Sequence, residues 1–412
     1  MRLIYLIVMV CMPIQTIAQT GQTLSLDEAV TRAIKYSPRL SAAAREVVAA
    51  RSSVRSAQSS ANPEITFAPG FSAGGSDTEL LIRRPLEING VREARTGVAR
   101  AHAKRVNAQA VVELRTLVHE TRSAYINLFR AREHRLLATE MVRFAEEFDR
   151  IARLLIEAGS RPGIESTQTS IEVSRAKHQL VESEAVEAIA LATLNTLIGR
   201  KPEESVDGIS LPPVSSLDIT NETLIAQALA ARTEITVDES AAEALRQEAR
   251  LVRAEGRPDL APQFRAGTVT RGFSDSGFGI GVTLPLFDLG SRRHRIQQME
   301  QGAKAQTEKL AETRNRIRLE VENAITRLRA AHSIVASYQQ GVVEQSRKLL
   351  DASQLGFREG KTNTVAVLEA QRTYRSVQSD YTKAQAEYAS ARAELELALG
   401  SVPSTRLPEV KK

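Results

Sequence analysis

Residues 291–358 read SRRHRIQQMEQGAKAQTEKLAETRNRIRLEVENAITRLRAAHSIVASYQQGVVEQSRKLLDASQLGFR and contain no proline. Small and apolar residues recur in this run at alternating steps of three and four, which is the spacing of a coiled-coil seam. One stutter, from Ile317 to Val321, locally relaxes the supercoil. The seam positions are Ile296, Met299, Ala303, Leu310, Ile317, Val321, Ala324, Leu328, Ala331, Val335, Tyr338, Val342, Leu349 and Ala352. The run predicts one helix about 100 Å long at 1.5 Å per residue.

A second helix is expected to follow a tight turn at residues 360–362. The seam resumes after this turn, and Gly400 is placed to close the helix as the residue after its C-cap. Two helices joined by a short turn lie antiparallel. The resumed seam comprises Ala370, Tyr374, Val377, Tyr381, Ala384, Tyr388, Ala391, Leu395 and Ala398.

The same arrangement occurs twice in the chain. An offset of 195 aligns Pro63 with Pro258, an offset of 200 aligns Pro85 with Pro285, and an offset of 201 aligns Gly159 with Gly360. A single period near 200 indicates a duplicated, domain-sized unit. Because the offset grows within the strand hairpin, the second hairpin is expected to have the longer loop or strands. The predicted order is a first repeat over 19–200 (helix, strand hairpin 64–88, long helix 91–158, return helix 164–198), a linker over 201–220, a second repeat over 221–400 (helix, strand hairpin 262–287, long helix 291–358, return helix 364–399) and a tail over 401–412.

The composition agrees with long packed helices. Of the 412 residues, 42% are hydrophobic and 25% are charged, there is no tryptophan, and the formal net charge is +6. After the N-terminus no apolar run is long enough for a membrane-spanning helix, so any membrane crossing must use strands.

Residues 1–18 have the features of a secretory signal: Arg2, an apolar run over 3–12, and small residues at Thr16 and Ala18. A short membrane anchor is the alternative. Cys11, the only cysteine, is a poor acylation site because Val10 precedes it. Removal of the signal would leave a mature chain without cysteine, hence without a disulfide or a thiolate metal site.

The clearest strand pattern lies in the second hairpin, where large apolar residues alternate with small ones such as Gly277, Gly279 and Gly281. Alternation over about ten residues is typical of a strand with one face on lipid. A strand on a soluble core has the same periodicity. We favour lipid because the long helices leave little else for this face to cover. The predicted lipid-facing residues are Phe278, Ile280, Val282, Leu284 and Leu286.

Two hairpins supply four strands for each chain. A sheet in lipid cannot leave open edges, and closed membrane barrels have at least eight strands. Two chains would give eight strands, three would give twelve and four would give sixteen. Several copies are therefore expected to share one barrel, with the helical hairpins projecting from it around a lumen.

The chain resembles the TolC family of outer-membrane efflux ducts. The duplicated layout matches, and Phe357-Arg358-Glu359-Gly360 with Val367-Leu368-Glu369-Ala370-Gln371 is similar to the family's aromatic-x-x-Gly and Val-Leu-x-Ala-Gln signature. The segment 85–95, PLEINGVREAR, resembles the heavy-metal (cobalt, zinc and cadmium) efflux branch. The resemblance implies a homotrimer with a twelve-stranded barrel in the outer membrane of a Gram-negative cell. It further implies an α-helical tunnel through the periplasm that docks onto an adaptor and an inner-membrane pump.

By the same resemblance, the two helical turns form the periplasmic tip that closes the duct and meets the adaptor. Glycine is also what any helical hairpin needs at its turn. The family often carries two acidic residues past the second turn; here these positions are Ala366 and Glu369, and Glu165 in the first repeat is placed to compensate. A ring of such acids would attract cations, whereas a solvated surface glutamate is the alternative. The tip residues are Gly159, Arg161, Pro162, Gly163, Gly360, Lys361 and Thr362.

Arginines cluster where the two long helices begin. Cations at a helix N-terminus oppose the helix dipole, so a nearby anion is expected, and lipid phosphates just below the barrel would supply it. A solvated face paired with glutamates is the alternative. The candidate membrane-interface residues are Arg92, Arg95, Arg292, Arg293 and Arg295.

The sequence contains no catalytic constellation. Its six histidines form no i, i+4 pair and have no cysteine or aspartate cluster at ligand spacing, so no resident metal, cofactor or enzymatic activity is expected. No nucleic-acid partner is expected either. The predicted function is passive conduction of a substrate, with divalent metal cations as candidates, that the pump selects. The alternative is a periplasmic coiled-coil adaptor or scaffold, although an adaptor usually has one helical hairpin and compact β modules.

Overall fold

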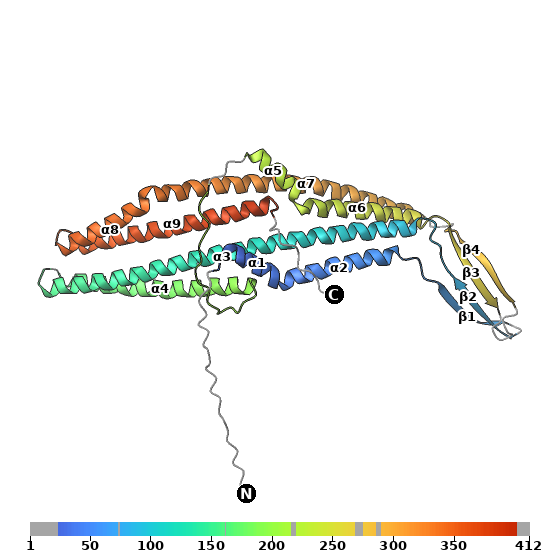
Figure 1. Cartoon of the computed structure of the whole chain (residues 1–412), viewed down its shortest axis with the longest axis horizontal. Coiled ribbons are helices and arrows are strands. Elements are labelled where there is room, and N and C mark those ends of the chain that lie inside the picture. The colour runs from blue at the N-terminus through green and yellow to red at the C-terminus, as the bar shows by residue number, and fades with distance from the viewer. Residues whose placement is uncertain are drawn as a thin grey trace, which may run out of the picture.

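The computed structural model describes residues 24–72, 75–160, 162–215, 220–267, 275–285 and 290–401. The predicted signal segment, Arg161, Leu286 and the predicted tail beyond Ser401 lie outside the described residues. The molecule is elongated, with a sheet at one end and two helical turns at the other (Figure 1). These two ends are the places where the sequence predicts membrane contact and adaptor contact.

One antiparallel sheet contains four strands of nine residues each: β1 (Glu64–Ser72), β2 (Gly75–Arg83), β3 (Asp259–Gly267) and β4 (Asp275–Thr283). Their spatial order is β1-β2-β3-β4, so the two hairpins from the two repeats lie side by side. Because the strands are equal in length, the larger offset in the second repeat lies between β3 and β4, where residues 268–274 separate the strands, against residues 73–74 between β1 and β2. In the part of the chain that the structure describes, β1 and β4 are the open edges of this sheet.

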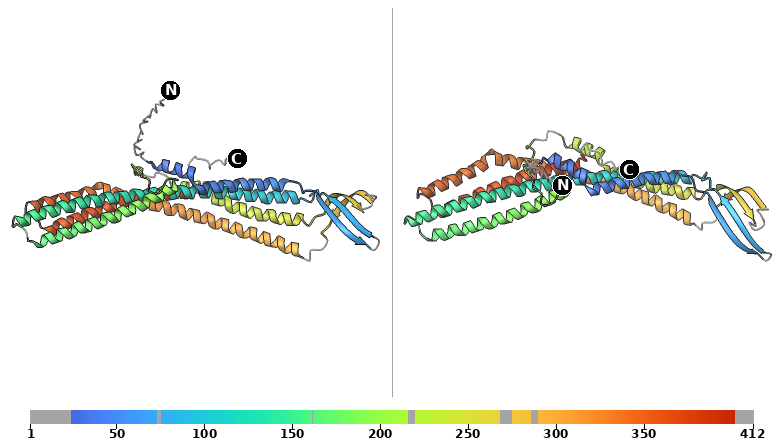
Figure 2. Two further views of the ribbon diagram at one scale, coloured as in Figure 1. Left: turned by 90° about the horizontal axis from the view of Figure 1, so that it is seen from below. Right: turned by 60° about the horizontal axis from the view of Figure 1, so that its bottom comes forward.

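The helices form a row that runs the length of the molecule (Figures 1 and 2). Next to the sheet, the order is α2-α3-α6-α7, and in the other half it is α4-α3-α9-α8. Helix α3 is central in both halves: it packs against α2 and α6 next to the sheet, and against α4 and α9 in the other half. The bounds are α1 Leu26–Tyr36, α2 Pro38–Gln58, α3 Val91–Glu157, α4 Ile164–Leu197, α5 Asn221–Ala231, α6 Thr233–Ala254, α7 Ser291–Ser337, α8 Val343–Arg358 and α9 Thr364–Ala398.

The prediction of one uninterrupted helix over 291–358 is wrong at Tyr338–Val342, which form a π-helix with Gly341 at φ 123°. A π turn holds one residue more than an α turn, so the buried seam shifts by one position. Val335 is buried before it and Leu350 after it, whereas the predicted seam residue Leu349 is 49% exposed. The predicted seam position Val342 is also exposed, at 42%.

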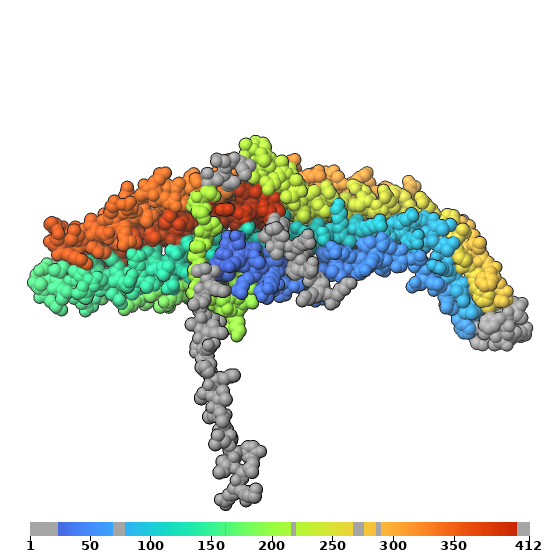
Figure 3. All heavy atoms as spheres, in the orientation of Figure 1, coloured from blue at the N-terminus to red at the C-terminus, as the bar shows by residue number. Residues whose placement is uncertain are grey.

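The segment between the repeats is held by two tyrosines. The Tyr125 hydroxyl of α3 donates to the Leu24 carbonyl at 2.9 Å and accepts from the Ser210 N–H at 3.2 Å. The Tyr388 hydroxyl of α9 donates to the Ser215 carbonyl at 2.7 Å and accepts from its N–H at 2.9 Å. In Figure 3 this segment, in light green, lies across the row of helices. One tyrosine from each repeat therefore fixes the connection to the middle of the molecule.

Candidate functional site

The sheet presents one continuous apolar face. Ile65 pairs with Ile82, Ile82 with Phe264, and Phe264 with Phe278, so these side chains lie on the same side of all four strands. Phe278 is 91% exposed, Ile280 71% and Ile65 69%. Val282 and Leu284, which follows β4, are exposed as well, at 56% and 52%. These large, exposed side chains form an apolar surface that no described residue covers. A lipid-facing strand requires such a surface.

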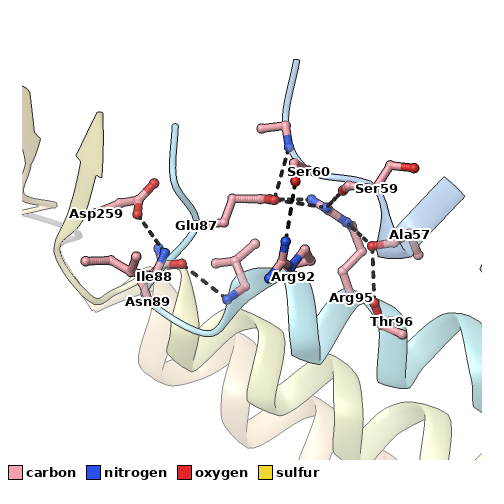
Figure 4. Close-up of polar contacts among 12 residues, drawn as sticks. Ala57, Ser59, Ser60, Glu87, Ile88, Asn89, Arg92, Arg95, Thr96 and Asp259 are labelled. Carbon is pink, nitrogen blue, oxygen red and sulfur yellow. Dashed lines mark hydrogen bonds and ion pairs between the residues drawn. The ribbon is translucent and has the colours of Figure 1, made fainter. Parts of the chain in front are cut away.

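A polar junction joins the sheet to the helices (Figure 4). Arg95 of α3 donates from Nη1 to Glu87 Oε1 at 2.6 Å, from Nη2 to the Ser59 carbonyl at 3.0 Å and from Nε to the Ala57 carbonyl at 3.2 Å. The two carbonyls belong to the end of α2, which otherwise leaves such groups unsatisfied. Arg95 thus ties the end of α2 to the chain that leaves β2.

The rest of segment 85–95 completes this junction. Glu87 has φ 53° and a side chain only 9% exposed, and it also accepts from the Ala61 N–H at 3.3 Å. Asn89 accepts from the Val91 N–H at the start of α3, and Asp259 of β3 accepts from the Ile88 N–H at 3.1 Å. The motif that resembles the heavy-metal branch is therefore a set of contacts between sheet and helices.

The other predicted interface arginines differ from Arg95. Arg92 is exposed and donates to the Ser60 hydroxyl at 3.4 Å. Arg293 is exposed, and Arg295 lies 3.9 Å from Glu255. The Arg292 guanidinium lies against Gly256, where a Cβ would stand 2.7 Å from its Nη1. We therefore assign Arg95 to the junction, and a lipid contact stays a prediction for the exposed members.

Replacing Arg95 with alanine is expected to lower the free energy of unfolding by about 2 kcal/mol, because the Glu87 carboxylate and two carbonyls lose their donor. The measurement is thermal unfolding of the purified protein. Arg100→Ala, at an exposed arginine of the same helix, is the control and should leave the midpoint unchanged. Equal midpoints for the two variants would show that the junction contributes no stability.

The two helical turns at the tip, after α3 and after α8, have the same backbone motif. After α3, the Ser160 N–H donates to the Leu155 carbonyl at 2.9 Å, with Gly159 at φ +72°. After α8, the Lys361 N–H donates to the Gly356 carbonyl at 2.7 Å, with Gly360 at φ +73°. These are Schellman motifs, which require glycine for the left-handed residue. Of the other predicted tip residues, Pro162, Gly163 and Lys361 are exposed, Thr362 is partly buried and donates to the Ser353 carbonyl at 3.1 Å, and Arg161 is outside the described residues.

The two predicted gate acids occupy different surroundings. Glu165, at the start of α4, accepts a hydrogen bond from the Thr364 hydroxyl of α9 at 2.7 Å, so it links the two repeats at the tip. Glu369 is 61% exposed and accepts from Arg372 of its own helix at 2.6 Å. The pairing with Arg372 offsets the charge of Glu369. A role for either acid as a gate stays a prediction.

A family model described as outer membrane efflux protein matches residues 29–200 and 224–401, which together cover both repeats. The chain belongs to the outer membrane efflux protein family. It is thus an outer membrane channel of tripartite efflux systems, with its long helices in the periplasm. Channels of this family form trimers and are not enzymes.

The names of two relatives state different functions, metal resistance and pyoverdine export. The chain is 26% identical over 370 residues to the cobalt-zinc-cadmium resistance protein CzcC of Cupriavidus metallidurans, covering 85% of this chain and 84% of CzcC. It is 27% identical over 286 residues to the pyoverdine export outer membrane protein OpmQ of Pseudomonas aeruginosa, covering 66% of this chain and 58% of OpmQ. The crystal structure of the outer membrane protein VceC from Vibrio cholerae has the same fold, with a TM-score of 0.76, 18% identity and coverage of 91% and 96%.

A buried ionic cluster, which the sequence did not predict, joins the two repeats of this efflux channel. Glu234 of α6 accepts hydrogen bonds from Arg115 of α3 and, at 3.1 Å, from Arg232. Arg232 also pairs with Glu320 of α7 at 2.8 Å and donates to the Ala398 carbonyl of α9 at 3.1 Å. Arg115 and Arg232 are 4% and 7% exposed. The only sequence signal was the presence of charged residues among core-facing positions.

Two features of the described residues bear on transport chemistry. No group of three or more His, Cys, Asp or Glu side chains there could hold a metal ion. Among the helices so described, none is both long and apolar enough to cross a membrane.

Proposed function

We propose that three copies of this chain form a passive duct that carries divalent metal cations outward from an adaptor and an inner-membrane pump. The observation that supports a trimer is that the sheet of a single copy has two open edges. Within the described residues, β1 and β4 are the edge strands of the sheet and pair with no further strand, and open edges cannot remain in lipid. Three copies supply twelve strands, with the apolar face on outer-membrane lipid and the exposed arginines Arg92, Arg293 and Arg295 near its phosphates.

The row of helices supports the same closure. Its two outermost helices in the tip half, α4 and α8, carry apolar side chains that the single chain leaves exposed. A second copy is the occupant we propose, because the α4 side of one copy can cover the α7–α8 side of the next and the ring closes after three. The residues concerned are Ile164, Ile171, Val181, Val186 and Ile189 on α4, and Leu319, Ile334, Val342, Leu349 and Leu355 on α7, the π-helix and α8.

The proposed cargo rests on the likeness to CzcC, whose name states cobalt, zinc and cadmium resistance. A duct must bind its cargo weakly, because conduction requires that ions leave as readily as they enter. We propose that the tip turns, including Gly159 and Gly360, meet the adaptor, and that Glu165 and Glu369 lie at the narrow end. The pump beneath the duct would then select the ion.

The test is deletion of the gene, followed by growth on cobalt, zinc and cadmium and on a panel of dyes. Loss of tolerance to the metals by severalfold, restored by a plasmid copy, is the expected result. Sensitivity to dyes with unchanged metal tolerance would overturn the proposed cargo. Separately, the membrane fraction should contain a heat-sensitive trimer, and a soluble monomer would overturn the duct itself.

A further inference from the structure

The face of the sheet opposite the apolar face carries two cross-strand ion pairs. Arg83 of β2 lies 2.7 Å from Glu64 of β1, its direct partner in the register. Arg265 of β3 lies 2.7 Å from Glu79 of β2. Since side chains alternate along a strand, all four lie on the side away from Ile65, Ile82, Phe264 and Phe278. The two pairs therefore link three neighbouring strands on one face.

The fourth strand adds no charge to this face between Gly277 and Thr283. Gly277, Gly279 and Gly281 alternate with the large apolar residues of β4. Gln263 of β3 leans over this strip, since a Cβ at Gly281 would stand 3.0 Å from its Oε1. Among the residues whose side chains the structure describes, the charges on this face of the sheet thus lie on β1, β2 and β3. Asp259 lies on the same side at the helix end of β3, where it accepts from the Ile88 N–H and belongs to the junction.

We propose that Glu64, Glu79, Arg83 and Arg265 determine the charge selectivity of the pore, and that their pairing keeps this part of the wall neutral so that ions of either sign pass. This inference rests on the proposed trimeric duct, in which the polar face lines the water-filled lumen. Each carboxylate there lies beside a guanidinium, so neither charge acts alone on a passing ion. A wall that favours no charge suits a duct whose pump has already made the selection.

Each substitution on this face is present in all three copies, so the trimer carries three times the charge change of one chain. Neutralising both acids frees two arginines in each copy, which is six positive charges around the lumen. Neutralising both arginines frees six negative charges. Charges that line a water-filled pore with a low-dielectric wall attract counter-ions and repel ions of their own sign. The two double variants should therefore shift selectivity in opposite directions from one parent.

The experiment measures reversal potentials of full-chain trimers in planar bilayers under a potassium chloride gradient. E64Q/E79Q should lower the potassium-to-chloride permeability ratio by about threefold or more, and R83Q/R265Q should raise it by a similar factor. The quadruple variant should return close to the parent. The control is Arg84→Gln, because Arg84 is the next residue along the chain and lies on the opposite side by strand alternation. Unchanged ratios in both double variants would overturn the inference, whereas absence of channels from the parent would overturn the proposed duct.

A second measurement tests which face of the sheet lines the lumen, and it alters no charge. The mature chain is predicted to lack cysteine, so Gly279→Cys and Ile280→Cys each introduce one thiol on opposite faces of β4. A Cβ at Gly279 meets nothing closer than 3.8 Å, so the substitution fits. In membrane-inserted trimers a charged, membrane-impermeant thiol reagent should modify the G279C variant and leave the I280C variant unmodified. Modification of the I280C variant alone would place the ion pairs on the lipid side and overturn the inference.

Discussion

Replacing Glu234 with leucine is expected to lower the free energy of unfolding by about 3–5 kcal/mol, because two arginines buried between the repeats lose a shared carboxylate. Arg115 is 4% exposed and Arg232 is 7% exposed. Arg232 keeps Glu320 and the Ala398 carbonyl, so most of the cost arises at Arg115. The measurement is thermal unfolding of the purified trimer by circular dichroism, together with the amount of trimer recovered from the membrane.

Two further variants make this prediction specific. Glu344→Leu removes an exposed carboxylate that pairs with Lys348 of the same helix, and it should leave the unfolding midpoint unchanged. Combining Arg115→Met with Glu234→Leu should recover much of the loss, because no unpaired charge then stays buried at this position. If the double variant is as unstable as Glu234→Leu alone, the unpaired arginine is not the cause.

The same cluster predicts that the stability of the folded protein depends on pH. Burial raises the pKa of the Glu234 carboxyl, but hydrogen bonds from Arg115 and Arg232 outweigh burial and hold this pKa below its usual value. A lowered folded-state pKa means that the contribution to stability is complete above the unfolded pKa of about 4.3 and is lost as the pH falls through the folded value. The gap in unfolding midpoint between the parent and Glu234→Gln should therefore narrow as the pH is lowered from 7 to 3. A constant gap would contradict this linkage.

Periodicity was enough to predict the arrangement of the repeats and the faces of the strands. Alternation at Phe278, Ile280 and Val282 needs no partner to be interpreted, because the side chains of a strand point to opposite faces whatever lies beside it. The offset between Gly159 and Gly360 likewise predicted equivalent helix ends, where both residues are left-handed in the structure. Features of this kind depend on local geometry alone.

Features that depend on distant partners were not predictable in the same way. Arg115 and Glu234 are 119 positions apart in the chain, and nothing in either neighbourhood indicates the other. Arg95 was predicted to contact lipid phosphates, but its donors are used by Glu87 and by carbonyls at Ala57 and Ser59. The π-helix at Gly341 was missed because the apolar residues continue through it at ordinary spacing, and only the packing reveals the shift.

Phe357, the aromatic residue of the TolC-like signature, holds the two helical hairpins together close to the tip. It is 1% exposed, and its ring centroid lies 4.8 Å from that of Phe148 on α3, in a tilted arrangement. Val367 of α9 and Ala152 of α3, both 0% exposed, complete this cluster. Beyond it, the repeats are joined at the tip by the hydrogen bond between Thr364 and Glu165.

Phe357→Ala is therefore expected to cost about 3–5 kcal/mol locally and to free the α8–α9 tip from α3. Because Gly341 interrupts the helix before α8, the released tip can swing without unfolding α7, so the main effect should be a wider duct end. Single-channel conductance in planar bilayers should rise severalfold, and hydrogen exchange should accelerate over residues 343–370 while α7 stays protected. Lys348→Ala, at a 73% exposed side chain of the same helix, is the control and should change neither. If Phe357→Ala keeps the parent's conductance while exchange in α8 accelerates, the tip contact holds the hairpins together but does not close the duct.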